Sequence, residues 1–590
     1  MFTFFDKLIF HSWLFYFMLA HFVLLVILVA FNIKYLWREI KKIDKKIWLA
    51  LLLIFLFGFY LRNSEYWLGT HTDGYVAQEA AHLWVTHGQF VKSCALGNHE
   101  NCQLFENVLA PPGYPFIIAL VHLTFGIHSL NASVISAILS SLTIILVFLI
   151  TYLIFKKEFA GLYAAIIYAL IPLNIINSQS GEARPTGLFF VGLAVIFYLL
   201  ALKNKKIATW LAAIACLSYA IYVRQESYVL VPLFGLFWIV FQWPEIKVFF
   251  ANIFKTRNIA WQKILSVVFL GAVFLTLQLV VLNWLLLDNP YNSYQGGGFF
   301  ALNYKGASLQ AQALFLQLFN QSPLNPQVWH YGIIVSIIFL ITIIVILIKK
   351  RKENYFIISL FLVYFVVYSL MVDANIVNGK LTGDYFRRSL MFNLPYAVIA
   401  GYGIYLLDIF KKGKHIFLKI AAFVAILIYL GPLSLPPLTD KIGKLPQNAY
   451  SNYSFYFPQK MFEDARATKT GDPSLIYPNI DYWQAIAKTP NPCIIITSQY
   501  IMVTNDYFPN NQRETLSIDL IFSDTEKIFK EKTAASNCLV YLEDYRCDPA
   551  YFGTADFGCQ FLEKYFNKKF LFSQETIKVY SLETKENSSL

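Results

Sequence analysis

Charged residues are scarce in this sequence of 590 residues. They make up 14% of it, whereas about 25% is typical of soluble globular domains. Hydrophobic residues make up 57% and come in blocks of about 20, the length that crosses the bilayer core as an α-helix. This composition excludes an ordinary soluble domain, and we predict a multi-pass integral membrane protein.

Several familiar signatures are also missing. The first apolar block, at 8–36, is too long for a cleavable signal and lacks a small-residue cleavage site, so we expect a retained helix. The GGG run at 296–298 lacks the Lys-Ser/Thr that follows the glycines of a phosphate-binding loop. No internal repeat of the kind found in secondary transporters is visible. Nucleotide binding and transport by a repeat fold are therefore disfavoured.

The net charge of +12 does not point to nucleic acid, because the basic residues form short clusters between apolar blocks. Such clusters mark cytoplasmic loops. They follow alternate spans, as in KYLWREIKKIDKK, FKKEF, KNKK, KKRKEN and KKGKH. We predict about twelve spans, at 8–36, 47–63, 129–155, 161–177, 185–203, 206–223, 227–243, 260–287, 328–349, 355–372, 389–410 and 415–431.

The remaining segments are expected on the extracytoplasmic side. Six of the seven cysteines fall in them, which suits an oxidising compartment. Cys94 and Cys102 share one loop and are predicted to pair. The partners of the four tail cysteines stay open, and a free buried thiol is an alternative for Cys493.

The tail has the pattern of a small α/β domain. PCIIITS and NCLVYLEDY predict buried strands, DYWQAIAK a short helix, and KKFLFSQETIKVYSLE a hairpin. We predict three parts: an additional N-terminal helix with its basic loop at 1–46, a transmembrane domain at 47–431, and an extracytoplasmic domain at 432–590.

Asp73 opens the stretch DGYVAQEAAHLW in the first large outer loop. An aspartate at this place suits a helix N-cap, and a catalytic role is the alternative. The stretch NVLAPPGYPFIIALVHLTFG follows, with a Pro-rich turn and an apolar run too short to span the bilayer. Both segments predict interfacial helices on the outer membrane surface.

Three further outer-edge segments carry charge where a membrane span disfavours it: SGEARPTGLFF, YVRQESYVL and GDYFRRSLMFNLP. Each arginine alone could be an interface anchor. Together, on the side where positive charge is rare, they favour a site for an anionic ligand, because the guanidinium fork suits phosphate oxygens. The arginines concerned are Arg184, Arg224, Arg387 and Arg388.

The order of these motifs resembles the GT-C superfamily of integral-membrane glycosyltransferases, in its protein O-mannosyltransferase-like and lipid A aminoarabinose transferase-like branches. The resemblance covers 47–431 and the outer domain. It implies a mostly helical fold, Asp73 as general base, and lipid-phosphate binding by Arg387 or Arg388, with Arg184 and Arg224 as further candidates. Gly74 stands where many members have a second acidic residue, and the supporting acids considered are Glu106, Glu182, Glu226 and Asp384.

The resemblance implies transfer of a sugar from a dolichyl or undecaprenyl phosphate to a hydroxyl on a lipid, glycan or protein. The reaction is expected to invert the anomeric carbon and to need no metal or other cofactor, with the bilayer, but no nucleic acid, as a further partner. We expect the active site on the extracytoplasmic face of the cell membrane. The alternatives are a metal-dependent oligosaccharyltransferase and a transporter or export component of polysaccharide assembly.

Overall fold

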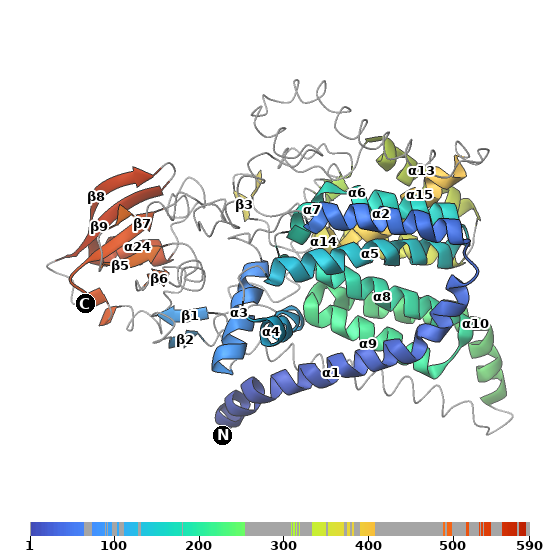
Figure 1. Cartoon of the computed structure of the whole chain (residues 1–590), viewed down its shortest axis with the longest axis horizontal. Coiled ribbons are helices and arrows are strands. Elements are labelled where there is room, and N and C mark those ends of the chain that lie inside the picture. Colours follow the sequence, from blue (N-terminus) through green and yellow to red (C-terminus); the bar gives the residue numbers. More distant parts are fainter. Residues whose placement is uncertain are drawn as a thin grey trace.

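The computed structural model is mostly helical, with a small C-terminal sheet. The described residues are 2–63, 73–88, 90, 93–96, 103–105, 111–127, 131–179, 181–253, 308, 311–312, 314–315, 318, 333–349, 352–370, 375–377, 380–382, 390–407, 488–489, 493–497, 515–517, 530–531, 533–534, 536–543, 557–574 and 577–585. A helical bundle forms one end of the molecule and a five-stranded sheet the other (Figure 1).

Ten of the twelve predicted spans coincide with helices, and the spans at 260–287 and 415–431 lie outside the described residues. Among described residues, five helices are long and apolar enough to cross a membrane, or six if the bent pair α6–α7 is one span. The number twelve therefore stays a prediction. The helices are α1 (Phe2–Ile40), α2 (Lys45–Asn63), α5 (Asn131–Phe155), α6 (Glu158–Leu170), α7 (Pro172–Gln179), α8 (Ala183–Asn204), α9 (Ile207–Val223), α10 (Leu230–Ile253), α13 (Ile333–Lys349), α14 (Lys352–Leu370) and α15 (Asn393–Leu406), with a 3₁₀ turn η2 (Gln225–Val229) between α9 and α10.

Small residues let the central helices approach closely. A Cβ on Gly401 of α15 would lie 2.4 Å from the backbone nitrogen of Ala164 in α6, so no larger residue fits there. Helix α2, by contrast, leaves apolar side chains such as Leu52, Leu53 and Leu56 about half exposed. In a membrane protein, we expect small residues where helices contact each other closely and apolar side chains on the surface that faces lipid.

The 67° bend between α6 and α7 follows from Pro172. Proline has no N–H, so the carbonyl of Tyr168 loses its usual helical donor. Arg62, at the end of α2, replaces it: Nη2 donates to Tyr168 O at 3.0 Å and Nη1 to Ala169 O at 2.9 Å. Its Nε donates to the Ser140 hydroxyl at 3.0 Å. A fully buried arginine thus satisfies the broken helix end, as backbone at membrane depth requires.

Two helices were predicted in the first outer loop and both form: α3 (Asp73–His87) and α4 (Gly113–Phe125). Between them an antiparallel pair, β1 (Ser93–Leu96) and β2 (Gln103–Phe105), was not predicted. Helix α3 lies beside α4, the start of α5 and the start of α8, and we call this part of the bundle the α3 end (Figure 1).

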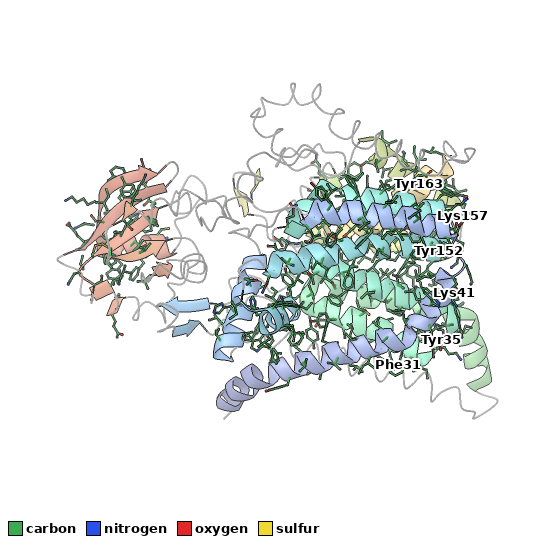
Figure 2. All side chains as sticks on the ribbon, viewed as in Figure 1. Phe31, Tyr35, Lys41, Tyr152, Lys157 and Tyr163 are labelled. Carbon is green, nitrogen blue, oxygen red and sulfur yellow. A yellow bond between two sulfur atoms is a disulfide. The ribbon has the colours of Figure 1, made fainter. Side chains whose placement is uncertain are left out.

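Basic loops gather at the opposite end. The Glu39 carboxylate contacts three lysines: Lys42 after α1 at 2.9 Å, Lys203 in the last turn of α8 at 2.5 Å, and Lys156 after α5 at 3.5 Å. Because basic clusters follow alternate spans, the sequence predicted that these three segments lie on one side of the membrane, and they do share one end of the bundle. Residues labelled at this end in Figure 2 include Tyr35, Lys41, Tyr152 and Lys157.

The C-terminal residues form a sheet in the order β6-β5-β7-β9-β8, made of β5 (Ile494–Thr497), β6 (Thr515–Ser517), β7 (Leu539–Glu543), β8 (Phe566–Gln574) and β9 (Ile577–Thr584). Strand β5 is parallel to both neighbours, whereas β8 and β9 form an antiparallel hairpin. Both buried strands and the hairpin are confirmed. Of the helix predicted at 481–488, residues 481–487 lie outside the described residues, and α24 (Phe557–Tyr565) precedes β8.

Cys493 and Cys538 form a disulfide beside β5 and β7, so the free-thiol alternative for Cys493 is wrong. The two residues directly precede paired strands, which brings their backbones together. Cys559 is disulfide-bonded as well. The predicted Cys94–Cys102 pair lies outside what the structure describes, although β1 contains Cys94.

Candidate functional site at the α3 end of the bundle

Helix α3 begins at Asp73, as the sequence predicted. The side chain of Asp73 lies outside the described residues, so its role as cap or base stays a prediction. What the structure does describe is how the helix behind Asp73 is held. Its side chains Ala77, Ala80, Ala81 and Leu83 are buried, so the helix packs closely against its neighbours.

A buried polar junction fixes α3 to α4 and α5. The backbone N–H of Ala132, in the first turn of α5, donates to Gln78 Oε1 at 3.0 Å. The Gln78 amide nitrogen lies 3.1 Å from His122 Nε2 in α4, and Asn131 Nδ2 lies 2.8 Å from His122 Nδ1. Gln78 therefore satisfies an N–H group that the start of a helix leaves without an intrahelical partner. Three helices meet one turn and a half from Asp73.

The PPGYP motif is built into the same junction. The Tyr114 hydroxyl donates toward Ala132 O at 2.7 Å and Gly181 O at 2.8 Å. A Cβ on Gly113 would lie 2.7 Å from the backbone carbon of Tyr222, and Tyr219 donates to Gly113 O at 3.0 Å. Glycine is required here because α4 starts in backbone contact with the end of α9. The motif thus sets where α4, and with it α3, can lie.

Two arginine–glutamate pairs lie at neighbouring helix ends. Arg184 Nη1 donates to Glu182 Oε2 at 3.1 Å, and both side chains are buried. Arg224 Nε donates to Glu226 Oε2 at 3.0 Å, and its Nη2 reaches Oε1 of the same carboxylate, a two-pronged contact that suits guanidinium. Both arginines were predicted site residues, and each has a carboxylate partner two residues along the chain.

The two pairs belong to one cluster. Arg184 interacts electrostatically with Glu226. A Cβ on Gly187 would lie 2.9 Å from Arg224 Cγ, so the first turn of α8 rests directly against Arg224. The cluster is also continuous with the α3 junction, because Ser136 of α5 donates to Glu182 O at 3.0 Å. Two cations and two carboxylates give the four residues a formal charge of zero.

Three hydroxyl groups that the sequence did not single out lie beside these pairs: Ser227 in η2, and Tyr364 and Tyr368 near the end of α14. All are buried; Ser227 and Tyr364 hydrogen-bond to each other, and the Tyr368 oxygen has no hydrogen-bond partner among the described residues. Tyr368 interacts electrostatically with Glu226, Arg224 and Arg184. The signal was present in YFVVYSL, where the two tyrosines are four residues apart and so share one helix face.

Comparison with known proteins agrees with this architecture. The sequence profile of the family described as dolichyl-phosphate-mannose-protein mannosyltransferase matches residues 110–284. No curated protein matches the chain by sequence. Among solved structures, ArnT from Cupriavidus metallidurans in the apo state aligns with a TM-score of 0.54 and 11% identity, over 90% of this chain and 97% of ArnT. The chain has the GT-C membrane fold.

Two further structures extend the comparison. ArnT bound to undecaprenyl phosphate aligns with a TM-score of 0.53 and 12% identity, over 91% of this chain and 98% of ArnT. The archaeal oligosaccharyltransferase AglB from Archaeoglobus fulgidus, in complex with an inhibitory peptide and a dolichol-phosphate, aligns with a TM-score of 0.45 and 12% identity, over 92% of this chain and 75% of AglB. The two ArnT alignments confirm, at the level of the fold, the GT-C resemblance that the motif order predicted.

The remaining predicted site residues lie outside the described residues: Arg387, Arg388, Asp384 and Glu106. The structure therefore brings together Arg184, Arg224, Glu182 and Glu226, and leaves the lipid-phosphate role of Arg387 or Arg388 a prediction. Among the residues that it describes, no three His, Cys, Asp or Glu side chains form a group able to hold a metal ion.

Proposed function

We propose that the chain is a membrane glycosyltransferase that moves a sugar from a polyprenyl phosphate to a hydroxyl acceptor, with Asp73 as general base. The family profile supports the donor class, because its description names a dolichyl-phosphate sugar and its match, residues 110–284, covers α4 to α10. The ArnT structure supports it too, because a protein of the same fold binds undecaprenyl phosphate.

The observation that carries the proposal is the polar cluster at the α3 end. Arg184 and Glu182 are buried and Arg224 and Glu226 are partly buried among helix ends. Charge within a membrane protein costs free energy, and charged residues retained there commonly belong to a functional site. The cluster joins the helix that begins with Asp73 through Ser136 and Ala132 of α5. A donor phosphate and an acceptor hydroxyl can therefore meet near one group of helix ends.

In the proposed reaction the acceptor oxygen attacks the anomeric carbon while the bond from that carbon to the phosphate oxygen breaks. Asp73 takes the acceptor proton in the transition state, and the electron pair of the broken bond leaves with the phosphate. One displacement inverts the anomeric carbon. Arg387 or Arg388 would bind the leaving phosphate, whose negative charge grows as the bond breaks.

We propose that Arg184 and Arg224, which lie among the described residues, also bind the donor phosphate. Each guanidinium already donates to a glutamate, so the phosphate and that glutamate would bind the same guanidinium. Since sugar nucleotides are cytoplasmic, a transferase of this kind needs a donor already carried across the membrane. We therefore propose the extracytoplasmic face for the α3 end, and a lipid, glycan or protein as acceptor.

Asp73→Asn tests the base directly. Asparagine caps a helix as well as aspartate does, so α3 is retained while the proton acceptor is lost. We expect release of free polyprenyl phosphate, measured with purified protein in nanodiscs and a panel of polyprenyl-phosphate sugars, to fall about 10²- to 10⁴-fold.

Asp44→Asn is the matched control. Asp44 accepts from the backbone N–H of Lys46 at the start of α2, at the opposite end of the bundle. This variant should keep full activity. Full activity in Asp73→Asn would leave Asp73 as a helix cap, and consumption of only a lipid-pyrophosphate glycan would favour an oligosaccharyltransferase instead.

A further inference from the structure

The end of the bundle opposite the α3 end, which we call the basic end, carries a large excess of positive charge. Its segments 34–46, 156–158 and 203–206 contain eleven basic and three acidic residues. At its centre, the Glu39 carboxylate contacts the ammonium groups of Lys42, Lys156 and Lys203, and we call these four residues the Glu39 cluster. One carboxylate faces three ammonium groups, so the cluster has a formal charge of +2.

The three lysines of the Glu39 cluster are held in place and are still accessible. The Glu39 side chain is 9% exposed, whereas those of Lys42, Lys156 and Lys203 are 57%, 49% and 50% exposed. Each ammonium group has three N–H donors, and the contact with Glu39 uses one of them. The helix dipole also favours lysine at a helix C-terminus, but it does not require three lysines to converge on one carboxylate. The cluster therefore presents N–H donors to a further anion.

The Glu39 cluster lies where the membrane-spanning helices reach the level of lipid headgroups. Helices α1, α5 and α8 are each long and apolar enough to cross a membrane, and the cluster forms at their C-terminal ends. On α1, Phe31 and Ile33 are 68% and 55% exposed, and Lys41 Nζ lies over the Trp37 ring at 5.8 Å (Figure 2 labels Phe31 and Lys41). Exposed apolar residues followed by aromatic and basic ones are typical of the membrane interface. An anion with an apolar tail fits this surface better than a soluble anion.

We propose that the Glu39 cluster binds the phosphate of an anionic phospholipid whose acyl chains lie along α1. This inference does not depend on the proposed glycosyltransferase function. In the orientation proposed above, the lipid belongs to the cytoplasmic leaflet, where anionic headgroups attract basic segments. Glu39 keeps the three ammonium groups together, and the phosphate binds to their remaining N–H donors. Because the lysines come from the ends of α1, α5 and α8, the bound lipid fastens α1 to the rest of the bundle.

Lys156→Met and Lys203→Met test the site, because each removes one ammonium group and keeps an apolar side chain. Binding of phosphatidylglycerol to the purified protein in neutral detergent is measured by native mass spectrometry, with phosphatidylcholine as the neutral lipid. We expect the wild type to prefer phosphatidylglycerol, and each variant to bind it at least about 10-fold more weakly, as loss of a hydrogen bond between charged groups predicts. Lys156→Arg and Lys203→Arg keep the charge and should retain most of the affinity. Melting temperatures with phosphatidylcholine show that each variant is folded.

Lys34→Met is the matched control. Lys34 lies on α1 near the same end, but its Nζ lies over the Tyr35 ring at 5.3 Å. The variant removes the same charge, and diffuse attraction to anionic lipid predicts a loss of at most about 5-fold. Equal losses in the Lys34 and cluster variants would overturn the site in favour of diffuse attraction.

Two further results would also overturn the lipid site. The first is a wild-type protein that binds phosphatidylglycerol and phosphatidylcholine equally. The second is displacement of phosphatidylglycerol by inorganic phosphate, which would show that the cluster binds a soluble anion instead. Neither measurement involves sugar transfer, so a failure of the proposed glycosyltransferase function would leave the outcome of this experiment unchanged.

Discussion

Arg62 illustrates how a single residue can be required by another that lies far away in the sequence. Its guanidinium is fully buried, and the acceptors that receive its N–H groups are neutral: three carbonyl oxygens and one hydroxyl. Those carbonyls belong largely to the end of α6, which carries partial negative charge and lacks donors because Pro172 follows. The buried cation is thus explained by local backbone chemistry and needs no carboxylate.

This explanation makes Arg62 and Pro172 energetically coupled. We expect Arg62→Met to lower the free energy of unfolding by about 1–3 kcal/mol, since buried carbonyls lose donors. In a Pro172→Ala background residue 172 regains an N–H for Tyr168 O, so the same change should cost at least about 0.5 kcal/mol less. Unfolding in detergent of the four proteins of this double-mutant cycle measures the coupling. Strict additivity would show that Arg62 does not serve the broken helix.

Among the elements, the position of α3 depends on helices that do not contain the proposed catalytic residue. Its buried face meets α4 and α5, and α4 in turn is set by the contact of Gly113 with the end of α9. The PPGYP motif is therefore structural: the two prolines and the glycine direct a short helix into the bundle, and Tyr114 ties it to α5 and to the turn before α8.

Gly113→Ala tests this arrangement. The added methyl group would press against the backbone of Tyr222, which cannot move as a flexible side chain can. We expect a loss of about 1–3 kcal/mol of stability and reduced transferase activity. Gly235→Ala in α10 is the control, since its Cβ would meet nothing within 4 Å, and helix propensity predicts a gain of up to about 1 kcal/mol. Equal melting temperatures for both variants would refute the tight contact.

For the whole molecule, the question is how independent the C-terminal sheet is of the helical bundle. The Cys493–Cys538 disulfide closes a segment of 45 residues between two adjacent parallel strands. A cross-link of this length stabilises mainly by restricting the unfolded chain, by about 2–4 kcal/mol. If the chain is divided into two domains at 431/432, as predicted, this disulfide should stabilise the C-terminal sheet and not the helical bundle.

A Cys493→Ala/Cys538→Ala double variant checks this division. We expect hydrogen exchange in β5, β7 and β9 to increase, while exchange in α5, α6 and α8 stays unchanged. Faster exchange in the bundle helices as well would show that the sheet and the bundle unfold as one unit.

The sequence by itself determined the features that depend on neighbouring residues. Apolar runs predicted ten spans that coincide with described helices, because the cost of burying backbone groups in lipid leaves few alternatives to a helix. Short runs rich in β-branched residues and bounded by turn residues predicted the buried strands of the tail, and the order of motifs predicted the GT-C fold. The helix start at Asp73 followed from the same local rules.

Only the tertiary structure decided which distant residues meet. The contact of Gly187 with Arg224, the contact of Ser227 with Tyr364, and the contact of Arg62 with the end of α6 join segments far apart in the chain. In the sequence, Tyr364 and Tyr368 were ordinary members of an apolar helix. The value of a polar group in a membrane protein depends on the partners that packing brings to it, and packing is not a local property.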